Sequence, residues 1–310
     1  MKVCIALGGG GARGYAHIGV LRGLFEMGIK EFYAISGTSA GGMIAGLFAM
    51  HKDPEAIYDK IKSFRESPLF ESLKFHEVYS EKDKLRKLYS NIREKVFMAK
   101  TLVSQSFLDE ETRDKVFTYL YGNDTLMEQY HPRLRVMATD LIKGRDIAFR
   151  GGSMHKVMKA TSALPGALPP VKLGDMLLVD GGITHNLPII PLLKDECDII
   201  IASDVSRSLP EKREYRNSAE ILIRCEYISL RRLQDIESPF ADVIISPDLS
   251  EYEWYEFDRL DEIIERGYEA FKKSKSEIDK AMNLFQRAKK KLILHKELVE
   301  KLTNHIVYFP

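Results

Sequence analysis

The sequence contains little of what usually marks a secreted or a nucleic-acid-binding protein. Only three of its 310 residues are cysteine, Cys4, Cys197 and Cys225, and they form no Cys-x-x-Cys pair. This pattern indicates neither a disulfide framework nor a zinc site, and it favours a reducing compartment. The formal net charge is only +1, so we expect no broad electrostatic attraction to nucleic acid.

The sequence also lacks a clear signal peptide and a clear membrane span. The apolar run near the N-terminus, residues 3–7, is too short for a secretory signal. Residues 32–51 carry no Asp, Glu, Lys or Arg and approach the length of a membrane helix, but four glycines and three Ser or Thr residues interrupt them. With 45% hydrophobic and 29% charged residues, the composition is ordinary for a globular protein, and we expect a cytoplasmic one.

The stretch around Ser39 predicts a strand, a tight turn and a helix. An apolar run over 32–35 leads into Gly37-Thr38-Ser39-Ala40-Gly41, and an apolar run of helical length follows. A Gly-x-Ser-x-Gly pattern in this context is typical of a nucleophile elbow. The turn needs glycine on both sides, because side chains two before and two after the serine would collide. The alternative is a glycine-rich loop that only lets a helix and a strand pack closely.

A second glycine-rich segment, residues 8–14, follows an expected strand over 3–7. Gly9, Gly11 and Gly14 match the dinucleotide fingerprint, but the acidic residue required after the second strand is missing. Consecutive glycine amides can instead converge as an oxyanion hole. Because the two strands are neighbours in the sequence, we expect this loop to face Ser39. Arg13 either fixes the loop or meets an anionic substrate group.

A candidate base lies at the end of a third apolar run, over residues 176–179. Asp180 follows that run and precedes two glycines, where open α/β sheets place catalytic groups. Burial in an apolar cleft would raise its pKa and strengthen it as a base. His185 is the nearest histidine for a triad, although a structural role is the alternative. Residues 161–170, rich in proline and small side chains, are expected to line a pocket, with Pro165 as a substrate contact.

The order of apolar and amphipathic segments predicts an α/β domain over residues 1–250, a helical insertion over about 53–130 and a helical extension over 251–310 that packs on the domain. The insertion could form the wall or lid of an apolar cleft, or simply cover one sheet face. Lys289-Lys290-Lys291 beside apolar residues suggest contact with an anionic membrane surface.

The expected strands are 3–7, 32–35, 134–139, 146–149, 176–179, 198–203 and 242–245. The expected helices include 15–27, 53–66, 81–93, 108–120, 153–160 with Ser153 as its cap, 219–236, 257–273 and 277–302.

Three motifs in a fixed order resemble the patatin-like phospholipase family. They are the glycine loop over residues 9–14, the Ser39 pentapeptide and Asp180-Gly181-Gly182. The segments 138–140, 165–166 and 186–188 are also similar to bacterial members, so the resemblance covers roughly residues 3–205. Plant members carry aspartate where this chain has Gly8, a difference of little expected consequence because the oxyanion donors are backbone groups.

The resemblance implies a three-layer α/β/α fold with a central, mostly parallel sheet and a serine–aspartate dyad without histidine. Ser39 would be the nucleophile, Asp180 the base, and the amides around Gly10, Gly11 and Ala12 the oxyanion hole. The implied activity is hydrolysis of lipid acyl esters through an acyl-enzyme, with no cofactor or metal. Alternatives are an esterase or thioesterase of the same mechanism, a non-catalytic lipid-binding regulatory protein, and a nucleotide-binding protein.

Overall fold

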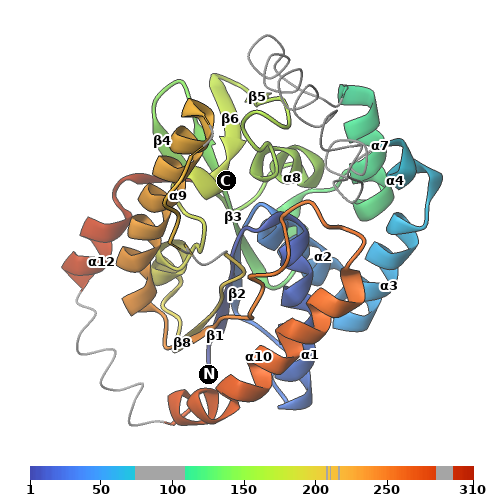
Figure 1. Ribbon diagram of the computed structural model, residues 1–310. Helices are drawn as coiled ribbons and strands as arrows, with labels where there is room; N and C mark the ends of the chain where they lie inside the picture. Colours follow the sequence, from blue (N-terminus) through green and yellow to red (C-terminus); the bar gives the residue numbers. More distant parts are fainter. Residues whose placement is uncertain (74–108, 207–208, 210, 216, 284–295) are drawn as a thin grey trace.

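The computed structural model describes residues 1–73, 109–206, 209, 211–215, 217–283 and 296–310 (Figure 1). Within these residues, a nine-stranded mixed sheet forms the centre of the molecule. Its main path runs through β5 (Val171–Leu173), β6 (Met176–Asp180), β3 (Arg133–Asp140), β2 (Ala34–Thr38), β1 (Val3–Leu7), β7 (Ile199–Ser203) and β8 (Val243–Ile245). β4 (Arg145–Phe149) pairs with β3, and β9 (Ile306–Phe309) pairs with β4.

Parallel pairings dominate the sheet, as expected. β1 with β2, β1 with β7, β2 with β3, β7 with β8 and β4 with β9 are parallel. β3 pairs antiparallel with both β4 and β6, and β5 pairs antiparallel with β6. The sheet therefore combines a parallel centre with an antiparallel edge.

The central strands are apolar on both faces because both faces are covered. In β1, Val3, Ile5 and Leu7 contribute to one core, while Cys4 and Ala6 contribute to the other. Alternating strand side chains point to opposite faces, so a continuous apolar run indicates a sheet buried on both sides. This arrangement is the middle layer of a three-layer fold.

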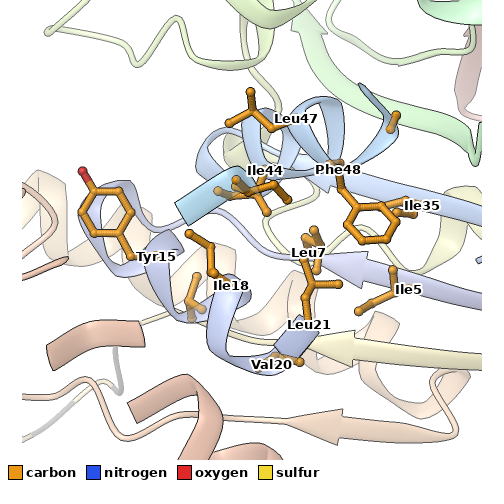
Figure 2. Packing of buried hydrophobic residues seen from close by; sticks show 14 of the residues in the cluster. Ile5, Leu7, Tyr15, Ile18, Val20, Leu21, Ile35, Ile44, Leu47 and Phe48 are labelled. Carbon is orange, nitrogen blue, oxygen red and sulfur yellow. The ribbon is translucent and has the colours of Figure 1, made fainter. Parts of the chain in front are cut away.

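The larger core lies under α1 (Ala16–Glu26), α2 (Ala40–His51), α3 (Pro54–Arg65), α8 (Met154–Thr161) and α10 (Leu260–Ala281). Figure 2 shows Ile18 and Leu21 of α1 and Ile44 and Phe48 of α2 gathered around Leu7 of β1. Phe48 is 1% exposed and meets Phe32 edge to face. Burial of a side chain of this size contributes about 1.5–3 kcal/mol.

The smaller core lies on the opposite face, under the 3₁₀ helix η4 (Ile190–Asp195) and α12 (Lys296–Thr303). In Figure 1, α9 (Ser218–Glu237) and α12 lie on the opposite side of the sheet from α1 and α10. Only Gln234 and Glu237 of α9 are buried among its described side chains. α9 therefore leaves most of its surface exposed.

The expected helical insertion contains α3, α4 (Pro68–Ser72) and α7 (Glu110–Tyr121). Side chains of all three helices, including Ile57, Phe70 and Phe117, contribute to the larger core. They pack on α1, α2 and α8, on the larger-core side of the sheet, so the covering role stays a prediction. The expected helix over 81–93 lies outside the described residues, so the lid role stays a prediction.

Several boundaries differ from the expectation. β5 and β9 were not expected, and the predicted C-terminal helical extension therefore also contributes a strand. α10 ends at Ala281, inside the two helices expected over 257–302, and residues 284–295 lie outside the described residues. Ser153 caps α8 as predicted, since its side chain accepts a hydrogen bond from the Lys156 amide.

The expectation that the cysteines form no disulfide is wrong. Cys4 of β1 and Cys197 form a disulfide, with Cα atoms 6.0 Å apart and a sequence separation of 193. They meet because β1 and β7 are neighbours in the sheet, with Cys4 opposite Ile200. Cys225 is free and exposed. In the parts of the chain that the structure describes, no helix has both the length and the apolarity to cross a bilayer.

Candidate active site

Ser39 lies at the sharp turn between β2 and α2, as the pentapeptide predicts. It adopts φ 53° and ψ −123°, a conformation that costs a non-glycine residue on the order of 1–3 kcal/mol. A methyl group on Gly37 would lie 2.6 Å from Gly42 Cα, and one on Gly41 would lie 2.1 Å from the Leu7 carbonyl oxygen. Both flanking glycines are therefore needed for the turn to close and to pack on β1.

The register of β3 brings Asp180 to the end of β2. Met137 of β3 pairs with Thr38, and the next residue, Ala138, pairs with Asp180. On one side of β3, β4 pairs with residues 136–140, the C-terminal half of β3. On the other side of β3, β2 pairs with the first part of the strand and β6 with the last part, so β6 follows β2 along that side. Ser39, one residue beyond Thr38, consequently meets Asp180, and the Ser39 side chain lies close enough to the Asp180 carboxyl group to lower its pKa.

The Asp180 carboxyl is buried, with 2% of the residue exposed. Its Oδ1 accepts a hydrogen bond of 2.8 Å from the Gly182 amide, and its own amide donates to the Ala163 carbonyl at 3.0 Å. Burial raises the pKa of Asp180 from 3.8 to about 6, while the Ser39 side chain and the hydrogen bond from Gly182 lower it in part. The side chain is therefore ionised at neutral pH and more basic than an ordinary aspartate.

The glycine loop faces Ser39, as its position after β1 predicts. A methyl group on Gly9 would lie 3.3 Å from Ser39 Cβ. The Gly9 amide donates to the Asn186 carbonyl at 2.8 Å. The amides of Gly10 and Gly11 donate to none of the residues that the structure describes. They are free to bind an oxygen atom of a substrate.

Ala12 does not share this freedom. Its amide donates to the Trp254 carbonyl at 2.7 Å, so that donor is already occupied in this conformation. The same carbonyl oxygen would lie 2.3 Å from a methyl group on Gly11, which has φ 59° and so requires glycine. The sequence could not show this, because residue 254 reaches the loop only in the folded chain.

Arg13 is 6% exposed and donates from Nε to the Gly10 carbonyl at 3.3 Å. This contact fits the loop-fixing role, and contact of Arg13 with substrate stays a prediction. Pro165 is exposed in the loop between α8 and β5. The Asp180 amide donates a hydrogen bond to the Ala163 carbonyl of the same loop. Contact of Pro165 with substrate stays a prediction.

His185, the triad candidate, faces away from Ser39. Its Nδ1 lies 2.5 Å from Glu237 Oε1, and its Nε2 lies 3.3 Å from Asp146 Oδ2. Its backbone carbonyl accepts a hydrogen bond of 2.6 Å from the Thr38 hydroxyl. The His185 backbone thus stabilises the turn through Thr38, while its imidazole contacts Glu237 and Asp146 and is not positioned to deprotonate the serine.

Three positioning residues escaped the sequence reasoning. Thr161 Oγ1 accepts the Ser39 amide at 2.9 Å, and the Asn186 side chain donates to the Gly9 carbonyl at 3.3 Å. His17, fully buried, bridges the Gly8 carbonyl and the Ser203 hydroxyl, each at 2.8 Å. Burial lowers the pKa of His17 to about 4, so it is neutral. Thr161 and Asn186 lie more than 100 residues from their partners, and no local pattern predicts such contacts.

A strained serine at a strand–helix turn, with a buried carboxylate and unoccupied glycine amides next to it, is typical of the α/β serine hydrolases. Residues 5–193 match the Patatin-like phospholipase family, and the chain belongs to that family.

Curated relatives agree with this assignment. Lysophospholipase NTE1 of Kluyveromyces lactis is 27% identical over 297 residues, which cover 86% of this chain and 18% of that protein. An uncharacterised NTE family protein of Mycobacterium bovis is 31% identical over 207 residues, which cover 67% of this chain and 50% of that one. The chain thus spans half or less of these relatives. Among solved structures, VipD from Legionella pneumophila is similar with a TM-score of 0.45 and 15% identity, covering 88% of this chain and 66% of that one.

Proposed function

We propose that this chain is a serine hydrolase that cleaves carboxylic esters of phospholipids or related lipids. The observation that carries the proposal is the strand register that places Ser39 beside a buried Asp180, whose pKa burial raises to about 6. A carboxylate held in this way accepts a proton from a hydroxyl more readily than an ordinary aspartate does. The match of residues 5–193 to the Patatin-like phospholipase family and the similarity to a lysophospholipase of Kluyveromyces lactis support lipid as the substrate class.

The reaction would proceed in two halves. Ser39 Oγ attacks the ester carbonyl carbon while Asp180 takes the hydroxyl proton, and the amides of Gly10 and Gly11 bind the developing oxyanion. Collapse of the tetrahedral intermediate expels the alcohol, which takes the proton from Asp180. Asp180 then deprotonates a water molecule that attacks the acyl-enzyme, and the fatty acid leaves as Ser39 regains its proton.

Contact with a lipid surface forms part of the proposal. The basic segment expected to make it, Lys289–Lys291, lies outside the described residues. Seven of the thirteen large hydrophobic side chains that are exposed in the described residues belong to α9. α9 connects the parallel strands β7 and β8, so the chain leaves the sheet toward α9 at the C-terminal end of β7. Ser39 follows the C-terminal end of the parallel strand β2 and therefore lies at the same end of the sheet. The first half of α9 would therefore rest on the lipid aggregate that supplies the substrate.

Labelling with a fluorophosphonate probe tests the catalytic claim. The wild-type chain should be labelled at Ser39, Ser39→Ala should not be labelled, and Asp180→Asn should react at least a hundredfold more slowly. Ser72→Ala, which removes an exposed serine, is the matched control and should label like the wild type. Absence of wild-type labelling, or equal labelling of Ser39→Ala, would contradict the proposal and favour a non-catalytic lipid-binding protein.

A substrate panel separates the remaining alternatives. Lipid hydrolysis predicts kcat/KM values that rise with acyl length and on aggregated substrates. A thioesterase or an esterase of small substrates would instead prefer thioesters or short water-soluble esters, with no gain on vesicles. Saturable binding of a dinucleotide would support the nucleotide-binding alternative for the glycine loop.

A further inference from the structure

We propose that Asp146, His185 and His305 form a site for one divalent cation of the zinc type, on the far side of the loop that carries Asp180. One ligand atom from each residue lies within 4.8 Å of the others. None of the three takes part in the proposed hydrolysis. The proposal therefore does not depend on the catalytic assignment.

The spacing of the ligand atoms suits tetrahedral coordination. Asp146 Oδ2 lies 3.3 Å from His185 Nε2 and 3.6 Å from His305 Nε2. Two ligands of a tetrahedral zinc ion, each about 2.0–2.1 Å from the metal, are separated by about 3.4 Å. The two imidazole nitrogens lie within 4.8 Å of each other, and because the rings stack nearly parallel, the exposed His305 ring would rotate to direct its nitrogen at the ion. Two imidazoles and one carboxylate are a donor set that zinc accepts with an open fourth position.

A fourth residue orients His185 as metal-bound histidines usually require. Glu237 Oε1 accepts a hydrogen bond from Nδ1 of His185, so a cation would bind at Nε2 and release to solvent the proton that Nε2 holds toward Asp146. Glu237 itself is 3% exposed, and its Oε2 accepts the amides of Ile189 and Ile190 at 2.9 Å and 3.0 Å. This carboxylate–histidine pair is rigid before any cation arrives.

The third ligand, His305, lies in the turn directly before the C-terminal strand β9. Asp146 of β4 pairs with Ile306 of β9, so His305 lies next to Asp146 by register. The His185 and His305 rings stack with centroids 5.6 Å apart. The His305 side chain is 48% exposed, whereas those of Asp146 and His185 are largely buried. His305 therefore provides both a path for the ion and room for a water molecule as fourth ligand.

A bound ion would link three segments that are far apart in the sequence. It would join β4, β9 and the 181–189 loop, whose His185 carbonyl accepts the Thr38 hydroxyl next to Ser39. The sequence gives no hint of the site, because its ligands are spread over residues 146–305 without a metal-binding spacing.

Calorimetric titration with Zn²⁺, and with Co²⁺ followed by visible absorption, tests the site on chain treated with a chelator and then dialysed. A Cys225→Ser background removes the exposed free thiol, which could bind metal by itself. We expect one ion per chain and a tetrahedral Co²⁺ spectrum. His305→Gln should weaken binding at least tenfold, and Glu237→Gln should weaken it about 10–100-fold.

His51→Gln, which changes an exposed histidine of α2, is the matched control and should bind like the background chain. His305 is half-exposed, so its substitution should leave the fold intact, and far-ultraviolet circular dichroism checks this. Failure of the background chain to bind stoichiometrically, or binding by His305→Gln as tight as that of the background chain, would overturn the proposal. The four side chains would then be a hydrogen-bonded charge network only.

Discussion

Asp180 is the residue whose protonation state should govern the reaction at low pH. Only its ionised form can accept the Ser39 proton, and burial sets its pKa at about 6. We expect kcat/KM for a water-soluble ester to fall tenfold per pH unit below about 6 and to level off above it. A pH series from 4.5 to 8 on wild-type protein measures this. Activity that stays constant down to pH 5 would contradict the assignment of Asp180 as the base.

The same buried charge should lower the stability of the fold. Between pH 3.8 and about 6 the folded state binds more protons than the unfolded state, so the stability contribution of Asp180 declines as pH rises through this window. Asp180→Asn should therefore raise the free energy of unfolding at pH 7, by roughly 1–3 kcal/mol, and should change it little at pH 3.5. Urea unfolding at the two pH values measures the difference.

Asp175→Asn provides the control, because Asp175 is an exposed residue in the turn before β6. Its substitution should leave the pH dependence of stability unchanged. If Asp180→Asn is less stable than wild type at pH 7, the desolvation argument fails even though the variant is inactive.

Residues with unusual backbone requirements were predictable from the sequence. Gly37, Ser39 and Gly41 could be identified because their spacing is typical of a strained turn. Asp180 could be identified because it ends a buried strand and precedes two glycines. Thr161 was missed because a threonine at a helix end has many uses, and only the fold brings it within 2.9 Å of the Ser39 amide. The occupied amide of Ala12 was missed for the same reason.

At the scale of elements, α9 carries a prediction about substrate presentation. Leu222 is 70% exposed and Ile223 is 48% exposed near the start of the helix. If these side chains enter a lipid surface, each contributes about 1.5–3 kcal/mol to adsorption. Leu222→Ser should then lower hydrolysis of vesicle lipids about tenfold and leave hydrolysis of a short water-soluble ester unchanged. Parallel assays on the two substrates measure the ratio.

Leu141→Ser is the matched control, because Leu141 is 51% exposed at the end of β3 rather than on α9. It should leave both activities unchanged. Equal loss on both substrates would assign Leu222 a structural role, and no loss on either would remove α9 from the lipid contact.

Most strands were predicted, including the three-residue β8, but two other short strands, β5 and β9, were not. β1 and β7 read as apolar runs because both of their faces are buried, whereas β2, with the sequence AISGT, overlaps the strand expected over 32–35 at only two residues. β5 has three residues after a pair of prolines, and β9 follows an amphipathic segment with only four residues. Such strands form because a neighbour offers unpaired backbone groups, and a local pattern of three or four residues cannot show that.

At the scale of the whole molecule, strand order was the part that the sequence could not supply. The order determines that β6 continues the line of β2 along β3, which brings Ser39 and Asp180 together over 141 positions of sequence. It also determines that Cys4 meets Cys197, contrary to the expectation from cysteine spacing. The dyad could still be named because its motifs resemble a known family, whereas no motif announces the disulfide.

The last strand ties both cores together, and this leads to a prediction about global stability. Ile306 and Tyr308 of β9 contact the smaller core, while Val307 and Phe309 contact the larger one. Ile306 is 5% exposed, so Ile306→Ala should lower the free energy of unfolding by about 2–4 kcal/mol. Ile142→Ala, at a position that is 62% exposed, should change it by less than about 0.5 kcal/mol.

Because β9 belongs to the same sheet as Ser39, the loss of stability in Ile306→Ala should appear as an earlier single transition, in which structure and fluorophosphonate labelling are lost at the same denaturant concentration. Separate transitions, with labelling retained after the strand has unfolded, would show that β9 is a detachable addition to the sheet.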